Sequence, residues 1–295
     1  MSKLADRLAQ PGILVADGAT GTMLQQAGLP RGMAPERWNL ENQTAVRALH
    51  KSYLDAGADV ILTNSFGGTR YRLERDSLSE QVHAVNRAAA QLARESAGEQ
   101  DLVFGDIGPI GALLKPLGKI TYEEARAAFA EQAAGLAAGE VDAILIETMG
   151  DLNEAKAAVE GVRLETDLPV IVTMSFDTHG YTVMGISPAQ AVSELWALGL
   201  AAVGANCGRT LSETLTAIQE MRSTRPEAVL MAKPNAGLPQ IHTKAQQASQ
   251  LVYDVTPEVM GEYACQFAEL GVKIFGGCCG STPEHIRAIA EALKS

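Results

Sequence analysis

The segment DAILIET (142–148) is an uninterrupted apolar run that ends in a carboxylate, and similar runs recur along the chain. They are ILVADGA (13–19), DVILTNSF (59–66), LVFGDIGP (102–109), PVIVTMSF (169–176), AAVGANCG (201–208), VLMAKPNAG (229–237) and VKIFGGCCG (272–280). Continuous apolar runs are typical of strands buried on both faces of a parallel sheet. The chain therefore carries eight candidate strands.

Ala-rich amphipathic segments of helical length separate these runs, for example at 44–57, 81–94, 123–139 and 257–271. Helix signals agree with them: Thr121 precedes Glu124 as a capping box, and Pro257 and Pro283 each follow a threonine. Gly57, Gly139, Gly199 and Gly271 lie where the helices should end. Eight strand–helix units predict an α/β fold, a (β/α)8 TIM barrel, with an open doubly wound sheet as the alternative.

The 295 residues fit one barrel, which typically needs about 250 residues. No linker or composition shift divides the chain, so we expect a single domain over residues 1–295, with excursions from the barrel at 24–40 and 236–255. The net charge of −11 argues against binding to nucleic acid or to an anionic membrane surface. No apolar run reaches the roughly 20 residues of a membrane span, and the polar N-terminus is unlike a signal peptide. Four cysteines are too few for a disulfide scaffold, which predicts a cytoplasmic protein.

Catalytic groups of such barrels lie at the C-terminal ends of the strands. The predicted strand ends carry Asp17, Gly18, Ala19, Thr20, Thr63, Asn64, Ser65, Phe66, Asp106, Glu147, Thr148, Ser175, Phe176, Asp177, Asn206, Cys207, Lys233, Pro234, Asn235, Cys278 and Cys279. The remaining cysteine, Cys265, falls within a helical pattern, where we expect a small buried residue. Barrel closure would bring the other three thiols to a common centre.

Three convergent cysteines suggest a Zn²⁺ site, and the lack of a fourth protein ligand suggests a catalytic one with an open position. One cysteine followed far along the chain by an adjacent pair fits no zinc-finger pattern. A buried vicinal thiol pair and a redox-active pair are therefore alternatives.

Several motifs resemble the homocysteine S-methyltransferase family, which includes the homocysteine-binding module of methionine synthase, betaine–homocysteine methyltransferases and S-methylmethionine-dependent enzymes. They are DGATGT (17–22), TNSFGGTR (63–70), IETMGDLNEAKAA (146–158), GANCG (204–208), PNAGLP (234–239) and GGCCGSTPEHI (276–286). The combination of GANCG with GGCCG is highly specific, and the match runs from about Asp17 to about Ile289. The resemblance implies that Cys207, Cys278 and Cys279 bind catalytic zinc and that the homocysteine sulfur takes the open position. It also implies that Asn235 occupies that position when substrate is absent.

The amino acid end of homocysteine needs charged partners. Glu147 ends an apolar strand, where a carboxylate is costly unless paired. We expect it to bind the substrate ammonium; an internal ion pair with Arg or Lys is the alternative. Asp17 at the end of the first strand is expected to bind the substrate ammonium for the same reason. The N–H groups of Gly18, Ala19 and Thr20 would hold the substrate carboxylate, and a simple tight turn is the alternative for these three residues.

Three thiolate ligands leave zinc electron-rich, which favours alkylation of a bound sulfur over hydrolysis. The product would be methionine, and the methyl donor would be betaine, S-methylmethionine or a methylated corrinoid protein. Trp38, Phe66, Tyr71 and Phe176 are candidates for cation–π contact with an onium donor, although core packing is the more common role for any one of them. A chain of this length has no room for a cobalamin or folate module, so we expect a corrinoid donor to arrive on a separate protein.

Two other functions fit the sequence less well. Lys233 near a strand end would suit a Schiff-base, aldolase-like enzyme, but this leaves the cysteines unexplained. A non-catalytic zinc or thiol sensor would need a metal site fully closed by protein. Association into a homo-oligomer through the outer helices is open.

Overall fold

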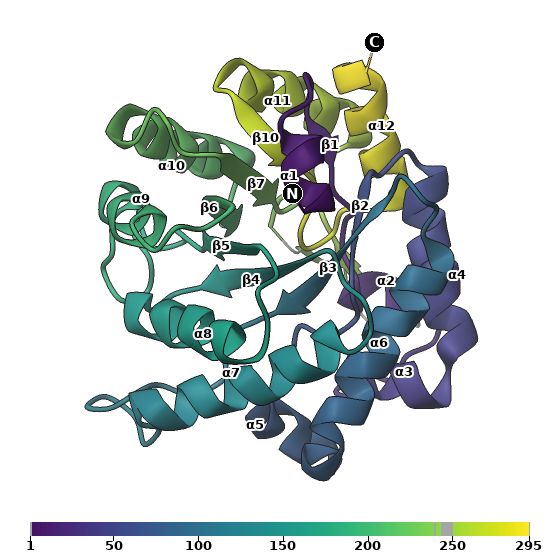
Figure 1. The fold of residues 1–295 in the computed structure, drawn as a ribbon. Coiled ribbons are helices and arrows are strands. Elements are labelled where there is room, and N and C mark those ends of the chain that lie inside the picture. The colour runs from purple at the N-terminus through teal and green to yellow at the C-terminus, as the bar shows by residue number, and fades with distance from the viewer. Residues whose placement is uncertain (1, 239, 243–249, 295) are drawn as a thin grey trace.

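The structure is a computed structural model that describes residues 2–238, 240–242 and 250–294. Its main sheet has eight strands, all paired in parallel, in the order β1-β10-β7-β6-β5-β4-β3-β2 (Figure 1). They are β1 (Leu14–Val15), β2 (Val60–Leu62), β3 (Leu102–Ile107), β4 (Ala143–Met149), β5 (Val170–Met174), β6 (Ala202–Cys207), β7 (Leu230–Pro234) and β10 (Val272–Phe275). A parallel bridge between Ala16 and Val60 joins the two ends of this order. The sheet is thus a barrel, as predicted, and not an open doubly wound sheet.

Helices surround the barrel (Figure 1). The main ones are α4 (Gln43–Asp55), α6 (Val82–Ser96), α7 (Tyr122–Ala137), α8 (Leu152–Glu165), α9 (Pro188–Trp196), α10 (Leu211–Thr224), α11 (Pro257–Glu269) and α12 (Pro283–Lys294). The capping box of Thr121 and Glu124 is present at the start of α7. Gly57, Gly199 and Gly271 have positive φ after their helices, but after α7 the left-handed residue is Glu140 rather than the expected Gly139. None of the helices in the described part of the chain has the length and apolarity needed to cross a bilayer.

The N-terminal end of the barrel is closed by the short helix α1 (Lys3–Leu8). Leu4 from this helix is fully buried in an apolar cluster with inward-facing strand residues such as Leu62, Phe104 and Met231. A second, larger cluster fills the space between the strands and the outer helices. The open end of the barrel is therefore the C-terminal one.

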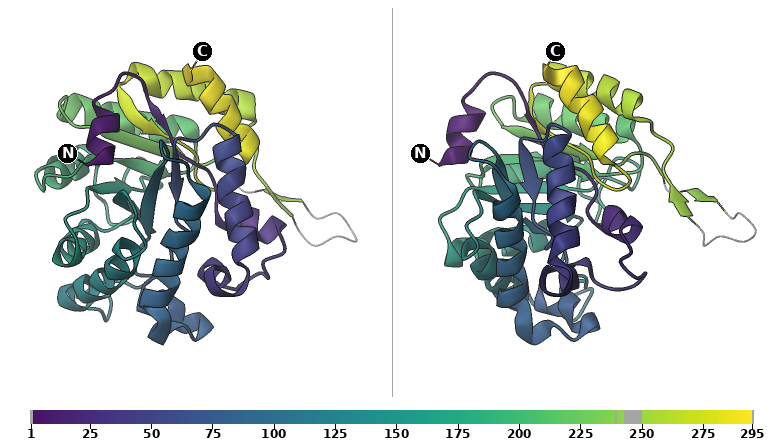
Figure 2. Two further views of the ribbon diagram at one scale, coloured as in Figure 1. Left: turned by 45° about the vertical axis from the view of Figure 1, so that its right-hand side comes forward. Right: turned by 90° about the vertical axis from the view of Figure 1, so that its right-hand side faces the viewer.

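Both predicted excursions lie at that end, opposite α1 (Figure 2). Between β1 and β2 the chain forms α2 (Gly21–Gln26), η1 (Pro35–Arg37) and α3 (Trp38–Glu41); a second short segment, α5 (Arg70–Leu73), with η2 (Glu74–Asp76) and η3 (Ser79–Gln81), follows β2. The 236–255 excursion, expected to be irregular, contains an antiparallel pair, β8 (Gln240–His242) with β9 (Gln250–Val252). Residues 239 and 243–249 of that excursion lie outside the described residues.

The expectation that Cys265 is buried is wrong. Cys265 lies on α11 but is exposed, and its Sγ is 3.9 Å from the carbonyl oxygen of Ala292. The inward face of α11 carries Met260, Ala264 and Phe267 instead. An alanine-rich amphipathic helix does not fix from sequence alone on which side of the apolar stripe a small residue falls.

Candidate active site at the C-terminal end of the barrel

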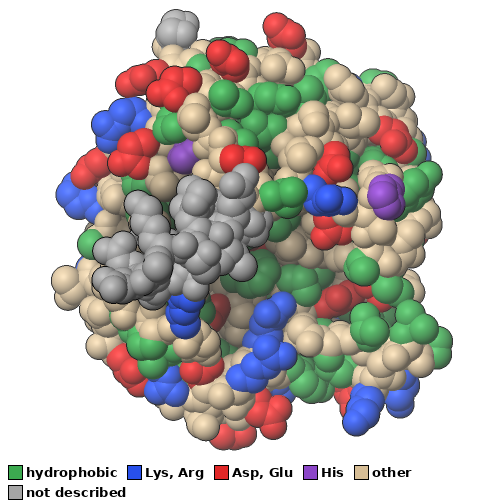
Figure 3. Space-filling view, turned by 180° about the vertical axis from the view of Figure 1, so that it is seen from behind, with side chains coloured by type: hydrophobic (Ala, Val, Ile, Leu, Met, Phe, Trp, Pro, Cys, Tyr) green, Lys and Arg blue, Asp and Glu red, His purple; other side chains and the backbone are tan. Residues whose placement is uncertain are grey.

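A cavity of about 530 Å³ opens at the C-terminal end of the barrel. Among its lining residues are most of the predicted site residues: Gly18, Ala19, Thr20, Glu147, Cys207, Lys233, Cys278 and Cys279. Asp17 lies just beneath its wall, with 1% of its surface exposed, and Asn235 is buried beside the cysteines without lining the cavity. Figure 3 views this end from outside, where basic side chains lie close to acidic and apolar ones.

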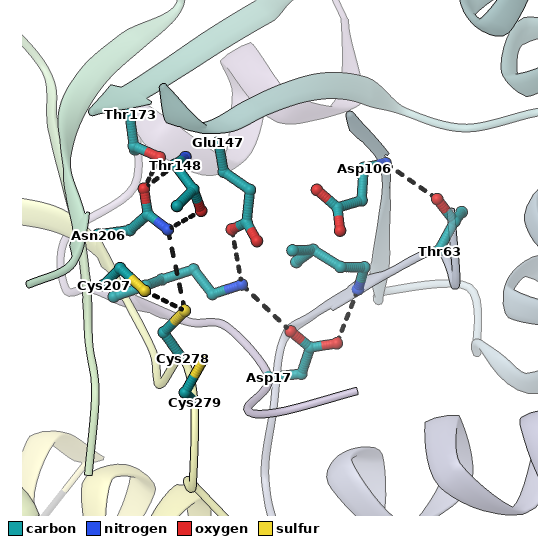
Figure 4. Close-up of polar contacts among 12 residues, drawn as sticks. Asp17, Thr63, Asp106, Glu147, Thr148, Thr173, Asn206, Cys207, Cys278 and Cys279 are labelled. Carbon is teal, nitrogen blue, oxygen red and sulfur yellow. Dashed lines mark hydrogen bonds and ion pairs between the residues drawn. The ribbon is translucent and has the colours of Figure 1, made fainter. Parts of the chain in front are cut away.

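The three predicted cysteines meet at one wall of the cavity (Figure 4). Cys207 ends β6, and Cys278 and Cys279 follow β10; the two strands are neighbours of β7 on either side. All three Sγ atoms lie within 4.8 Å of one another, and those of Cys207 and Cys278 are 3.7 Å apart. The barrel thus makes one cluster from residues that are far apart in the sequence.

The cluster is favourable for a cation and unfavourable for three free thiolates. The contact with Cys207 and burial raise the pKa of Cys278 well above the ordinary thiol value. For Cys207, the hydrogen bond with Cys278 favours the thiolate, but Cys279 and burial outweigh it and raise the pKa to about 12. A soft divalent cation would reverse this balance, because it binds thiolates and removes their protons. The donor set, three sulfurs within reach of one point, fits such an ion.

The backbone around the cluster is strained. Cys207 and Thr148 both have a φ of 62°, a left-handed conformation that costs side-chain-bearing residues about 1–3 kcal/mol. Asn206 holds this arrangement: its Oδ1 accepts from the Thr148 backbone N–H at 2.8 Å and from Thr173 Oγ1 at 2.7 Å. Its Nδ2 donates to Thr148 Oγ1 at 2.7 Å and faces Cys278 Sγ at 3.9 Å. Asn206 therefore fixes the position of the sulfur cluster relative to β4.

Asn235 joins the two cysteine-bearing loops. Its Nδ2 donates to the Gly208 carbonyl at 2.7 Å, and its Oδ1 accepts from the Cys279 backbone N–H at 3.0 Å. Both ends of the amide are therefore engaged, and the second lone pair of Oδ1 is the one that a metal ion could use. Tyr253, which the sequence did not single out, packs over the same loop, where a Cβ on Gly280 would come within 2.2 Å of its ring.

The floor of the cavity carries a buried ion pair network (Figure 4). Lys233 Nζ lies 3.3 Å from Glu147 Oε2 and 3.8 Å from Asp17 Oδ1, and the lysine is 2% exposed. Burial favours the neutral amine, but the charges of Glu147 and Asp17 outweigh it and raise the pKa of Lys233. The internal ion pair, the alternative for Glu147, is thus present. A permanently charged Lys233 is unsuited to Schiff-base chemistry, which needs the neutral amine.

Two carboxyl groups of the floor resist ionisation. Burial raises the pKa of Asp17 to about 7, although Lys233 and a hydrogen bond from the Leu62 N–H oppose it. Burial and the nearby charge of Glu147 raise the pKa of Asp106 well above its usual range. Asp106 was recognised only as one of many strand-end residues, and its position on β3 facing Glu147 is what marks it as part of the site.

The predicted anion-binding turn is only partly available. The Ala19 N–H donates to the Ser281 carbonyl at 3.0 Å, so it cannot serve a ligand at the same time. The N–H groups of Gly18 and Thr20 have no acceptor among the described residues. A side chain at position 18 would place its Cβ 2.6 Å from the Ser281 oxygen, so this turn requires glycine.

The mouth of the cavity carries charged side chains of both signs and one aromatic ring. Arg72 lies over the Phe66 ring, 5.4 Å from its centroid, and donates from Nε to the Pro109 carbonyl at 2.6 Å. Glu36 also lines the mouth and accepts from the Gly67 N–H at 2.6 Å. Of the four candidate aromatic residues only Phe66 lines the cavity; Trp38 and Phe176 are buried, and Tyr71 packs against the core.

Comparison with known proteins bears on this site. Residues 14–293 match the model of a protein family described as homocysteine S-methyltransferase. Methionine synthases of Mycobacterium leprae and Mycobacterium tuberculosis are each 33% identical to this chain, with alignments that cover 98% and 99% of it. The chain spans 25% of the length of each of these relatives. The metallated form of the homocysteine methyltransferase MmuM from Escherichia coli has the same fold, with a TM-score of 0.82 at 23% identity over 98% of this chain and 99% of that one.

Proposed function

The chain belongs to the homocysteine S-methyltransferase family, and we propose that it transfers a methyl group to the sulfur of homocysteine, which yields methionine. The observation that carries this proposal is the cluster of three thiols on the wall of a cavity whose floor holds buried charges. Sulfur ligands suit thiol chemistry, and the charged floor suits a zwitterionic amino acid.

We propose Zn²⁺ as the metal and Cys207, Cys278 and Cys279 as its ligands. Bound zinc would supply the Lewis acidity that lowers the pKa of a substrate thiol, and three cysteinate ligands would leave the bound sulfur electron-rich. Among the His, Cys, Asp and Glu side chains of the described residues, this candidate group consists of three cysteines, and an all-sulfur ligand set would favour thiol alkylation over hydrolysis.

The chain's own residues hold the amino acid end of the substrate. Glu147 uses Oε2 for Lys233, whereas its Oε1 has no partner among the described residues and is available to an ammonium group. Asp17 keeps Lys233 charged and in place beneath the cavity. The free N–H groups of Gly18 and Thr20 are available to the substrate carboxylate. The sulfur of homocysteine would then lie toward the cysteine wall.

The donor remains one of three classes in this proposal: betaine, S-methylmethionine or a methylated corrinoid protein. In each case the new bond is between sulfur and the methyl carbon, and the electrons of the broken bond stay on the donor's nitrogen, sulfur or cobalt. The Phe66 ring, the one candidate aromatic face in the cavity, is already covered by the Arg72 guanidinium. This works against cation–π binding of an onium donor at that position.

The first prediction tests the reaction and the metal together. Methionine formation from homocysteine is measured with betaine, S-methylmethionine and methylcobalamin in parallel, and zinc content is measured by atomic absorption. C279A should lose zinc and reduce methylation by at least about 100-fold. Mutation of residues that hydrogen-bond to metal ligands typically costs about 10- to 100-fold in metal affinity or activity, and loss of a ligand itself should cost at least as much. C265A removes the exposed cysteine of α11 and should change neither.

Full activity in C279A would contradict this mechanism. Stoichiometric zinc without methylation from any donor would favour a zinc or thiol sensor instead. Reductive trapping of a carbonyl compound on Lys233 by borohydride would favour the Schiff-base enzyme.

A further inference from the structure

Asp106 is a buried carboxyl group without a cationic partner within ion-pair distance. Only 4% of its surface is exposed, it lines the cavity, and its Oδ1 has no hydrogen-bond partner among the described residues. An unsatisfied buried carboxylate oxygen costs free energy, and a ligand that donates a hydrogen bond to it would recover that cost.

The backbone of Asp106 is firmly held while its carboxyl group is free. Its N–H donates to Thr63 Oγ1 at 2.9 Å, and its carbonyl accepts from Ser65 Oγ at 2.7 Å and from Gln132 Nε2 at 3.3 Å. The side chain is thus presented from a fixed point on β3, and Figure 4 shows its carboxyl group directed into the space that Glu147 also faces.

The three carboxyl groups of the floor cannot all ionise beside a single ammonium group. Lys233 contacts Glu147 and Asp17 but makes no ion pair with Asp106, so one ammonium serves three carboxyl groups. The raised pKa of Asp106 has burial as its main cause and the charge of Glu147 as the next. A second cation with N–H donors, placed between Asp106 and Glu147, would relieve both.

We propose that Asp106 binds the α-ammonium group of the substrate, together with Oε1 of Glu147, and thereby makes the site selective for thiols that carry an α-amino group. This inference rests on the proposed function, since it assigns an orientation to the same substrate. In this orientation the ammonium lies between Asp106 of β3 and Glu147 of β4. The thiol points across the barrel toward Cys207 at the end of β6 and the two cysteines that follow β10.

The test compares two thiols that differ only in the amino group, homocysteine and 4-mercaptobutanoate. Their binding to the zinc-loaded protein is measured by titration calorimetry, which needs no methyl donor. The wild type should bind homocysteine roughly 10- to 100-fold more tightly, as expected for hydrogen bonds to a charged group. D106N should lose most of this preference and bind 4-mercaptobutanoate within about threefold of the wild type.

D177N is the matched control, because Asp177 is an exposed carboxylate at the end of β5 that lines a neighbouring crevice and not this cavity. It should keep the preference for homocysteine. If D106N does not fold, D106S removes the same charge with a smaller side chain and is read in the same way. An undiminished preference for homocysteine in D106N or D106S would overturn the inference. A wild type that binds neither thiol would instead contradict the proposed function.

Discussion

Leu4 at the N-terminal end of the barrel and Lys233 at the C-terminal end are both almost fully buried, but their surroundings differ. Leu4 packs into a cluster made only of apolar side chains. Lys233 lies among Asp17, Asp106 and Glu147, three carboxyl groups that no second buried cation balances among the described residues. Burial of apolar side chains stabilises the fold at the N-terminal end, whereas desolvation of charged groups destabilises it at the C-terminal end.

Left-handed residues occur at both ends, since Glu140 lies in the loop between α7 and β4 at the N-terminal end. Cys207 and Thr148, both with left-handed φ, lie at the C-terminal end beside the cavity. Strain and unpaired charge persist only where the surrounding structure holds them, and here Asn206 and the closed barrel do so. The comparison therefore separates a stabilising end from a binding end, and substitutions at the two should have separable effects.

The largest effect on stability is expected at the N-terminal end. L4A should lower the free energy of unfolding by about 3 kcal/mol, because it leaves a cavity in a closed apolar cluster. Methyl transfer per folded molecule should stay within about twofold of wild type. Urea unfolding followed by circular dichroism measures the first quantity, and an assay corrected for folded fraction measures the second.

L8A on the same helix is the control, since Leu8 is only partly buried against that cluster and should cost less. A large loss of activity in L4A at unchanged stability would show that the two ends are not separable.

The same division explains what the sequence could predict. Continuous apolar runs such as DAILIET specify buried parallel strands whatever their neighbours are, and eight of them close in a barrel. The topology then brings Cys207 to Cys278 and Cys279, because β6 and β10 must lie near each other once the ring is closed. For this reason the fold and the convergence of the thiols could be predicted from the sequence.

The arrangement of the charged floor was harder to predict from the sequence. Lys233 pairs with Glu147, at 3.3 Å between Nζ and Oε2, and leaves Asp106 without an ion pair. This outcome depends on distances across the barrel. Ala19 loses its free N–H to Ser281, a residue from the other end of the chain. Cys265 turned outward because its helix packs on another face. Each outcome depends on which polar atoms meet after folding, a property that local patterns do not contain.

A smaller effect is expected when a charge is removed from the binding end. E147Q should raise the KM for homocysteine about tenfold, which corresponds to about 1.4 kcal/mol, because in the proposed binding mode the floor loses the negative charge that faces the substrate ammonium. Zinc content should not fall, since the charge of Glu147 is among the causes that raise the pKa of Cys278. Steady-state kinetics and metal analysis on the same preparation measure both. Loss of zinc in E147Q would mean that Glu147 supports the sulfur cluster and not the substrate.

The smallest effect concerns a carboxylate at the binding end that no proposed step uses. Glu154, near the start of α8, is buried and accepts from the Ile110 N–H at 2.6 Å. Burial raises its pKa to about 7, with the Ile110 hydrogen bond and Arg72 opposing the shift. Because the folded-state pKa lies above the unfolded value, the protonated form is the one that stabilises the fold. That contribution is complete below about pH 4.5 and is lost as the pH rises through 7.

E154Q, which cannot ionise, should therefore match the wild type at pH 4 and exceed it by about 1 kcal/mol at pH 8. The gain stays below the full linkage value because the buried amide hydrogens of Gln need partners of their own. Urea unfolding at both pH values measures the difference, and E165Q, an exposed position on the same helix, should show no change between them. If E154Q were less stable than the wild type at pH 8, the ionised Glu154 would be a stabilising partner of Arg72. Burial of charge at the C-terminal end would then not destabilise the fold, and the contrast with the apolar N-terminal end would fail.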